Sequence, residues 1–314
     1  MKTFGNDVKN ARKCENINDP VDTYVVDYIG MFFSRIFIKL HIIPNVITVL
    51  SGVVGVAGGI MLMLNSVWAD ILGVFLIIMS AVFDASDGQV ARLTKKYSNL
   101  GRTLDGVADG SVYLTIYAAL CVRLFNANIP FTDTQWGFWI IPAAALALYF
   151  YGAQCRTADY YKNLHMYMVK NGKGNELSRT AEIKKQIAAC KKFSFERFRL
   201  TIYCMYTGTQ EKEAPSTNKL LKKIEENGEV PERLSDAFAE KSRKYVKFTN
   251  LLTFNLRTFI LFILLFLPWA GAEFFYIPFV VLILEPIRVA IILKYERLTK
   301  KLAGQDFSVS MKTE

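Results

Sequence analysis

The chain has 314 residues, of which 52% are hydrophobic and 13% aromatic, and its mean hydropathy is +0.22. This composition is too apolar for an ordinary cytosolic enzyme of this length and predicts an integral membrane protein. The formal net charge of +10 is better explained by loops beside anionic lipid headgroups than by nucleic acid, because the chain is half apolar, so we expect no nucleic-acid partner.

Residues 1–42 predict a cytoplasmic N-terminus that ends in a helix lying on the membrane. Within this segment, residues 21–40 (VDTYVVDYIGMFFSRIFIKL) place apolar and charged side chains at helical spacing, and Pro44 follows. A helix with one apolar and one charged face lies along the membrane interface rather than across the bilayer. We therefore expect an N-terminal interfacial amphipathic helix.

Six later stretches are each long and apolar enough to cross a bilayer, which takes about 20 mostly apolar residues. They are residues 43–64, 68–92, 101–125, 136–160, 249–270 and 273–295. The expected fold class is therefore all-α, a bundle of six transmembrane helices with spans 1–4 in residues 43–160 and spans 5–6 in residues 249–295.

Lys and Arg indicate the orientation of the bundle, since they are retained on the cytoplasmic side. Neither residue occurs in the connections 65–67, 126–135 and 271–272. Lys and Arg are frequent in residues 1–42, 161–248 and 296–314, and residues 93–100 contain Lys95 and Lys96. We therefore expect both termini, with a tail at 296–314, on the cytoplasmic side of a multi-pass protein.

Residues 161–248 form a polar insertion between spans 4 and 5. Helical sequence follows Ser178, and Pro215 and Pro231 each precede another helical stretch, because proline is favoured at the start of a helix. These signals predict a cytoplasmic helical insertion. Two interpretations stay open, a solvated helical hairpin and a lid that takes part in substrate recognition.

The first span carries a stripe of small residues, Ser51, Gly55 and Gly59, at four-residue spacing. Small side chains on one helix face let another helix approach closely. The stripe therefore predicts close packing, either inside one bundle or, less expected, between two copies of the chain.

Four aspartates lie at the cytoplasmic ends of spans 2 and 3. Asp84 and Asp87 are three residues apart and Asp105 and Asp109 are four apart, so each pair shares a helix face. The short turn between the two spans makes them antiparallel neighbours, and all four carboxylates can converge. Helix-end charges reaching for water would explain one such residue but not four in register.

Converging carboxylates need a cation between them. Two carboxylates about 5 Å apart repel by roughly 3 kcal/mol at an effective dielectric of about 20. Oxygen ligands favour Mg²⁺ or Mn²⁺, and four carboxylates could hold two ions. Histidine chemistry is disfavoured, because His41 and His165 are the only histidines and lie far apart in the chain.

Small and basic residues between the aspartates fit a phosphate ligand. Gly88 and Ala91 leave the backbone uncovered beside the carboxylates, and Gly101 adds an empty position on the face of Asp105. Arg92 can offer two hydrogen bonds to one phosphate. The sequence thus places a phosphate-binding surface beside the expected metal ions.

The complete pattern, D-x2-D-G-x2-A-R-x8-G-x3-D-x3-D from Asp84 to Asp109, resembles the signature of the CDP-alcohol phosphotransferases, membrane enzymes that release CMP. The resemblance implies a homodimer with six spans and an interfacial helix, and it does not extend to residues 161–248. It implies metal ligands at Asp84, Asp87, Asp105 and Asp109, with Asp109 also as general base. The CDP contacts that it implies are Asp84, Gly88, Ala91, Arg92, Gly101 and, as weaker matches, Asn45 and Thr48.

This resemblance implies transfer of a phospho-alcohol group from a CDP-linked donor to a hydroxyl acceptor in the bilayer. Our leading hypothesis is CDP-diacylglycerol with inositol or inositol phosphate, because Arg156, Arg257 and Arg288 could surround an anionic or polyhydroxylated acceptor. Two simpler explanations would account for arginines in apolar segments. Glu285 could neutralise Arg288 on the same helix, or arginines at the ends of spans could extend toward water.

Two other functions stay open at this stage. A CDP-choline or CDP-ethanolamine donor could react with diacylglycerol or a ceramide. A divalent-cation transporter could also use intramembrane carboxylates, although such sites usually lie near the middle of the membrane on broken helices.

Overall fold

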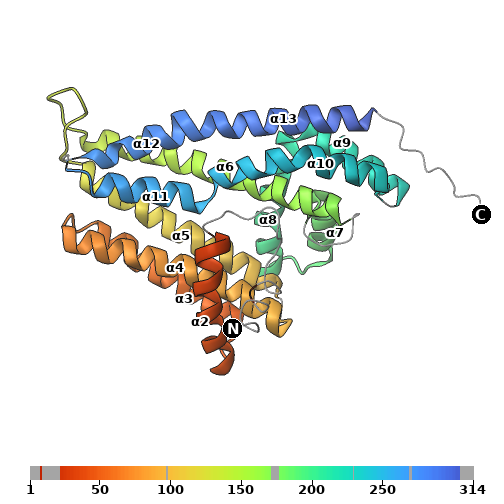
Figure 1. The fold of residues 1–314 in the computed structure, drawn as a ribbon, viewed down its shortest axis with the longest axis horizontal. Coiled ribbons are helices and arrows are strands. Elements are labelled where there is room, and N and C mark those ends of the chain that lie inside the picture. Colours follow the sequence, from red (N-terminus) through yellow and green to blue (C-terminus); the bar gives the residue numbers. More distant parts are fainter. Residues whose placement is uncertain are drawn as a thin grey trace, which may run out of the picture. The chain divides into compact units, whose positions relative to one another are not determined.

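The computed structural model describes residues 8, 22–96, 98–170, 177–228, 230–268 and 271–304. In these ranges the chain is α-helical, and its only β contact is an isolated bridge between Asn128 and Gln135. Figure 1 shows the helices, whose bounds are η1 (Asp22–Val26), α2 (Asp27–Lys39), α3 (Pro44–Leu62), α4 (Val67–Thr94), α5 (Asn99–Leu124), η2 (Gly137–Trp139), α6 (Ile140–Val169), α7 (Thr180–Ala189), α8 (Phe195–Glu213), α9 (Pro215–Asn227), α10 (Glu232–Phe248), η3 (Thr249–Leu252), α11 (Phe254–Leu265), η4 (Ala272–Phe275), α12 (Tyr276–Pro278), η5 (Phe279–Leu284) and α13 (Glu285–Ala303).

The predicted all-α membrane fold is confirmed. Six helical stretches of the described chain are long and apolar enough to cross a bilayer, namely Pro44–Leu62, Val67–Thr94, Thr103–Leu124, Gly137–Val169, Glu232–Leu265 and Ala272–Ala303. The fourth continues past the predicted end at residue 160, because residues 161–169 contain neither Gly nor Pro to stop the helix. The chain is an integral multi-pass membrane protein.

The helices form two compact units. Unit 1 comprises residues Met1–Tyr151 and Phe254–Leu282, and unit 2 comprises Gly152–Thr253 and Ile283–Glu314. The border falls inside α6, so this helix contributes to both units. The predicted division at the membrane boundaries, into residues 1–42, 43–160, 161–248, 249–295 and 296–314, is a different one and stays a prediction.

Glycines let α3 pack closely against α4 and α5 in unit 1. A Cβ atom added at Gly55 would lie 2.4 Å from Val112 Cγ2, and one added at Gly59 would lie 2.6 Å from Thr115 Oγ1. Both distances are far below normal contact, so only glycine fits there. The small-residue stripe therefore serves packing inside unit 1, where α3 lies against α4 and α5.

Polar side chains hold α2 against α4. Ser86 Oγ donates a hydrogen bond to the carbonyl of Gly30 (3.0 Å), and Gln89 Nε2 donates to the carbonyl of Asp27 (3.0 Å). Ser34 Oγ donates to Gln89 Oε1 (2.9 Å). Ser34, Ser86 and Gln89 are buried, so each polar group needs these partners. Ser86 and Gln89 thus hold one side of α4 against α2, while Asp84 and Asp87 lie close to them in sequence on the same helix.

The outer side of α2 is apolar. Tyr28, Ile29, Phe32 and Ile36 are exposed, with Phe32 57% accessible. The location of α2 at the membrane interface stays a prediction.

A buried ion cluster joins three elements of unit 1. Arg123 at the end of α5 contacts Asp70 in the first turn of α4 (2.6 Å) and Glu273 in η4 (2.5 Å), and Arg123 Nη1 also donates to the carbonyl of Leu62. The three side chains are between 6% and 8% exposed. Asp70 precedes Asp84 by fourteen residues, about 21 Å along α4, so the cluster is separate from the predicted metal site.

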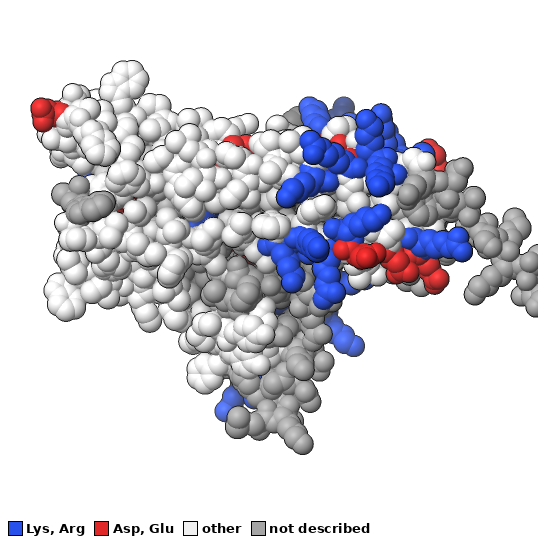
Figure 2. Space-filling view, turned by 45° about the horizontal axis from the view of Figure 1, so that its top comes forward, with Lys and Arg blue, Asp and Glu red and all other residues white. Residues whose placement is uncertain are grey.

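In unit 2, α9 and α10 pack along α13. Glu296 of α13 accepts hydrogen bonds from the backbone amides of Ser216 (2.7 Å) and Thr217 (3.1 Å), and so caps the start of α9. Figure 2 shows Lys and Arg side chains gathered over this part of the chain. The sequence of α10 contains Lys241, Arg243, Lys244 and Lys247, and that of α13 contains Lys294, Arg297, Lys300 and Lys301.

Candidate metal centre

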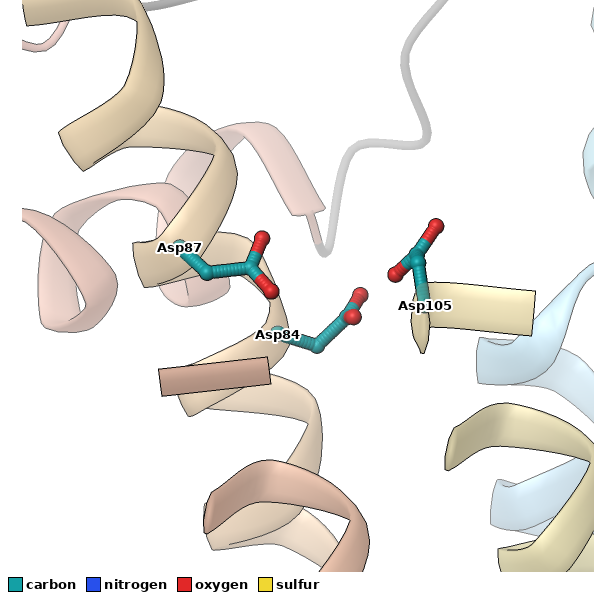
Figure 3. Close-up of side chains that lie close together, drawn as sticks. All are labelled: Asp84, Asp87 and Asp105. Carbon is teal, nitrogen blue, oxygen red and sulfur yellow. The ribbon is translucent and has the colours of Figure 1, made fainter. Parts of the chain in front are cut away.

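Three of the four predicted aspartates meet in unit 1. Asp84 and Asp87 extend from the last third of α4, and Asp105 extends from the second turn of α5. One carboxylate oxygen from each lies within 4.8 Å of the other two. Figure 3 shows the three side chains pointing toward one another. The close packing of α3 with both helices brings the aspartates together.

The arrangement fits a divalent cation. At 4.8 Å, each pair of ionised carboxylates repels by about 3.5 kcal/mol at an effective dielectric of about 20. The Oδ1 atom of Asp84 is buried, and none of the described residues donates a hydrogen bond to it. A buried carboxylate oxygen without a donor requires another partner. These three residues could hold Mg²⁺ or Mn²⁺.

The start of α3 positions Asp87. Pro44 opens this helix, and Thr48, one turn later, donates a hydrogen bond from Oγ1 to Asp87 Oδ2. Thr48 is 3% exposed. The sequence predicted a role for Thr48 in binding the nucleotide; its contact in the structure is with a carboxylate of the cluster.

Asn45 also contacts another helix at this site. Ser98, the N-cap of α5, donates from Oγ to Asn45 Oδ1 (2.9 Å) and accepts from the amide of Gly101 (2.8 Å). A Cβ atom at Gly101 would lie only 2.8 Å from Asn45 Oδ1. Asn45 and Gly101 thus join the start of α3 to the start of α5. Ser98 was missed by the sequence analysis, although serine before a helix is a recognisable capping signal.

Gly88 and Arg92 lie one turn apart on α4. A Cβ atom at Gly88 would lie 3.1 Å from Arg92 Nη1 and 3.3 Å from Nη2, so the guanidinium group passes over the glycine. Ala91 and Arg92 are partly exposed. A guanidinium over a helix face that has no side chain at Gly88 suits a phosphate group, because Arg can donate two parallel hydrogen bonds.

Asp109 lies one turn beyond Asp105 on α5, about 6 Å along the helix axis. It is exposed and is not one of the three residues that share the 4.8 Å cluster. Its carboxylate thus lies outside the group of three closely spaced ligand oxygens.

The three predicted acceptor arginines have different surroundings. Arg257 of α11 belongs to unit 1, is fully buried and lies over the ring of Tyr151 at 4.7 Å. Arg288 of α13 forms ion pairs with Glu285 (2.7 Å) and Glu213 (3.0 Å). Glu285 therefore neutralises Arg288, as the simpler explanation of this arginine predicted, and Glu213 contributes a second carboxylate.

Arg156 of α6 belongs to unit 2 with Arg288. Its Nε atom is buried and has no hydrogen-bond partner among the described residues. Convergence of the three arginines on one acceptor stays a prediction.

Comparison with known proteins finds a matching domain that contains the four aspartates. Residues 41–168 match the family model of CDP-alcohol phosphatidyltransferase, a range that includes α3, α4, α5 and all four aspartates. Over 108 residues the chain is 32% identical to a protein of Cereibacter sphaeroides named CDP-diacylglycerol--glycerol-3-phosphate 3-phosphatidyltransferase. This match covers 34% of the present chain and spans less than half (44%) of that relative's length. No solved structure matches the chain significantly. Residues 41–168 of the chain, which carry the four aspartates, are therefore similar to the CDP-alcohol phosphatidyltransferase family.

Proposed function

We propose that this protein is a divalent-metal-dependent CDP-alcohol phosphotransferase that makes membrane lipids and releases CMP. The convergence of Asp84, Asp87 and Asp105 from two helices within the matched domain carries the proposal. Asp109 completes the ligand set. Two ions, Mg²⁺ or Mn²⁺, would neutralise the diphosphate of the donor and the departing CMP.

The residues of this chain have distinct roles in the proposed reaction. Arg92 and the uncovered backbone at Gly88 bind the donor phosphates, with Asn45, Thr48, Ala91 and Gly101 shaping the same surface. Asp109 accepts the proton of the acceptor hydroxyl. The acceptor oxygen forms a bond to the phosphorus next to the alcohol group, and the bond from that phosphorus to the CMP oxygen breaks. Transfer is direct in this proposal. The Ser-His contact of the described chain, between Ser242 Oγ and His165 Nδ1 (2.7 Å), is buried in unit 2, whereas the aspartates belong to unit 1.

The donor in this proposal is CDP-diacylglycerol, which is the donor named for the relative from Cereibacter sphaeroides. The acceptor is inositol phosphate or inositol. The alternative is CDP-choline or CDP-ethanolamine with diacylglycerol or ceramide. The family match disfavours the other alternative, a divalent-cation transporter.

The test is CMP release by the purified protein in nanodiscs. Each CDP-linked donor is offered in turn with inositol phosphate, inositol, glycerol 3-phosphate, diacylglycerol or ceramide, and the lipid product is identified by mass spectrometry. We expect release only with a divalent cation and a matched acceptor. Cation flux without CMP release, in the same protein in sealed liposomes, would support the transporter instead.

The proposal includes a homodimer with its active site and both termini on the cytoplasmic side. The absence of Lys and Arg from the connections 65–67, 126–135 and 271–272 supports this orientation. Labelling of single cysteines by a membrane-impermeant reagent in sealed vesicles tests the orientation, and mass determination in nanodiscs tests the oligomeric state.

Replacing Gly88 with Val should reduce donor affinity by about 10-fold or more without unfolding the protein. The new side chain would meet the Arg92 guanidinium, which is the flexible end of a side chain and can move away. The helix therefore tolerates the change while the phosphate-binding surface is filled. Binding of CMP and of a non-reactive CDP-diacylglycerol analogue, measured by calorimetry, checks this.

The matched control is Gly208→Val on α8. There a Cβ atom would meet Thr180 Oγ1 at an ordinary 3.9 Å. Normal affinity in Gly88→Val would mean that the donor phosphates lie elsewhere.

Replacing Arg156 with Gln should raise the KM for inositol phosphate by about 10-fold or more, which equals the loss of about 1.4 kcal/mol in a charge-assisted contact. The KM for the donor should barely change. We expect a smaller effect for Arg288→Gln, because two carboxylates already neutralise Arg288. Arg257→Gln should resemble Arg156→Gln if its charge also contacts the acceptor.

Steady-state kinetics with inositol phosphate and inositol as paired acceptors separates these cases, and Arg297→Gln on the exposed side of α13 is the control. A greater loss with the phosphorylated acceptor would indicate contact with its phosphate. Equal, small changes in all three variants would contradict an anionic acceptor and favour a CDP-choline or CDP-ethanolamine donor.

A further inference from the structure

Helix α8 in unit 2 carries an exposed stripe of large apolar side chains. Phe195, Phe198, Ile202 and Met205 are between 52% and 70% exposed, and Phe193 just before the helix is fully exposed. At about 100° per residue, the four helical positions fall within an arc of about 80°. The stripe is therefore continuous along most of the helix.

The opposite face of α8 holds the helix in unit 2. Leu200, Thr207 and Gln210 are buried there, α8 packs on α7, and Gln210 Nε2 donates to the carbonyl of Arg156 in α6 (3.1 Å). Ser194 caps the first turn by accepting a hydrogen bond from the amide of Arg197 (3.2 Å). The stripe is thus presented outward by a well-anchored helix.

A transmembrane span does not account for these exposed side chains. Exposed apolar residues on the six candidate spans are expected to face lipid tails, but α8 is not among those spans. In water, a contiguous apolar patch with several aromatic rings marks a surface that binds something.

The chain around the stripe is strongly basic. Residues 184–199 contain six Lys or Arg and a single acidic residue, Glu196. Lys184, Lys185, Lys191 and Lys192 are exposed. These lysines lie in α7 and in the connection before α8, beside the apolar stripe. An apolar helix side with Phe that borders a basic surface is the pattern of elements that lie in the headgroup region of anionic membranes. Two copies of this basic surface would repel each other, which disfavours a dimer through the stripe.

We propose that the α7–α8 hairpin lies on the cytoplasmic membrane surface, with the α8 stripe inserted among the headgroups and the lysines bound to anionic phospholipids. The insertion is then a second membrane-contacting element in addition to the six spans. This inference does not depend on the proposed enzymatic function, because its test needs no turnover.

The test uses the full chain in nanodiscs with the five native cysteines replaced. A single spin label is placed at residue 198, 202 or 205, or at the control residue 222, where Lys222 is exposed on α9. Collision rates with oxygen and with a water-soluble nickel complex report immersion. In phosphatidylglycerol-rich nanodiscs, we expect the ratio of oxygen to nickel accessibility at the stripe to exceed the control by about 5-fold or more.

The charge contribution is measured with Lys191→Gln and Lys192→Gln. Each should weaken insertion into anionic nanodiscs by about 5-fold and leave insertion into phosphatidylcholine nanodiscs little changed. Stripe labels as accessible to nickel as residue 222 would overturn the proposal. Labels shielded from both reagents would also overturn it, because they would indicate that protein covers the stripe. Equal insertion into both lipid compositions would overturn it as well.

Discussion

Asp109→Asn is expected to lower turnover by about 10²- to 10⁴-fold, the usual contribution of a general base, while CMP and donor binding stay within a few-fold of normal. The amide fills the same space but cannot accept the proton of the acceptor hydroxyl. Asp109 is exposed and lies outside the cluster of three carboxylates, so the change leaves Asp84, Asp87 and Asp105 in place. Single-turnover CMP release measures the chemical step, and calorimetry measures donor affinity.

Asp84→Asn is the contrasting variant. Asp84 belongs to the cluster, and its loss should first raise the Mg²⁺ or Mn²⁺ concentration needed for half-maximal activity, because excess cation can partly offset a weaker site. Activity of Asp109→Asn that is restored by added cation would make Asp109 a metal ligand only. Unchanged activity at all cation concentrations would remove it from the reaction.

Arg123→Met is expected to destabilise the protein by about 3–5 kcal/mol, because it leaves Asp70 and Glu273 buried without their cation. The loss should appear as a lower midpoint of thermal unfolding in detergent. Arg297→Met, on an exposed part of α13, is the control and should stay within about 0.5 kcal/mol of the parent.

A combined replacement separates the charge from the packing at this cluster. Asp70→Leu, Arg123→Met and Glu273→Leu together should recover most of the stability, since a buried ion cluster can often be exchanged for apolar side chains at little cost. A thermal midpoint for Arg123→Met equal to that of the parent would contradict a structural role for the cluster.

Helix geometry explains how much of the site follows from sequence. Asp84 and Asp87 are three residues apart in a helix, so their side chains must share a face wherever that helix packs. The connection between α4 and α5 is too short to do anything but return the chain antiparallel, which brings Asp105 beside them. The six spans follow from a second constraint, since the bilayer requires each crossing to be about 20 apolar residues.

The buried ion cluster was within reach of the same argument but was missed. Asp70, Arg123 and Glu273 are charges near the ends of apolar stretches, and the predicted topology puts them on the side of the membrane opposite the aspartates predicted to bind metal. Opposite charges that are expected on one membrane face are candidates for an ion pair. Their spacing of 53 and 150 residues in the chain hides the pairing from any local pattern.

The sequence by itself determined the all-α class, the six membrane-crossing stretches and the carboxylates that share a helix face, because these depend on hydropathy and on the local helical repeat. Only the tertiary structure decided that Gly55 and Gly59 face α5, that Thr48 contacts Asp87, that Asp109 lies outside the cluster of three, and that the apolar stripe of α8 points outward. Each of these depends on how one helix is rotated against another. That rotation is set by the sum of many packing contacts between distant residues, and no short stretch of sequence specifies it.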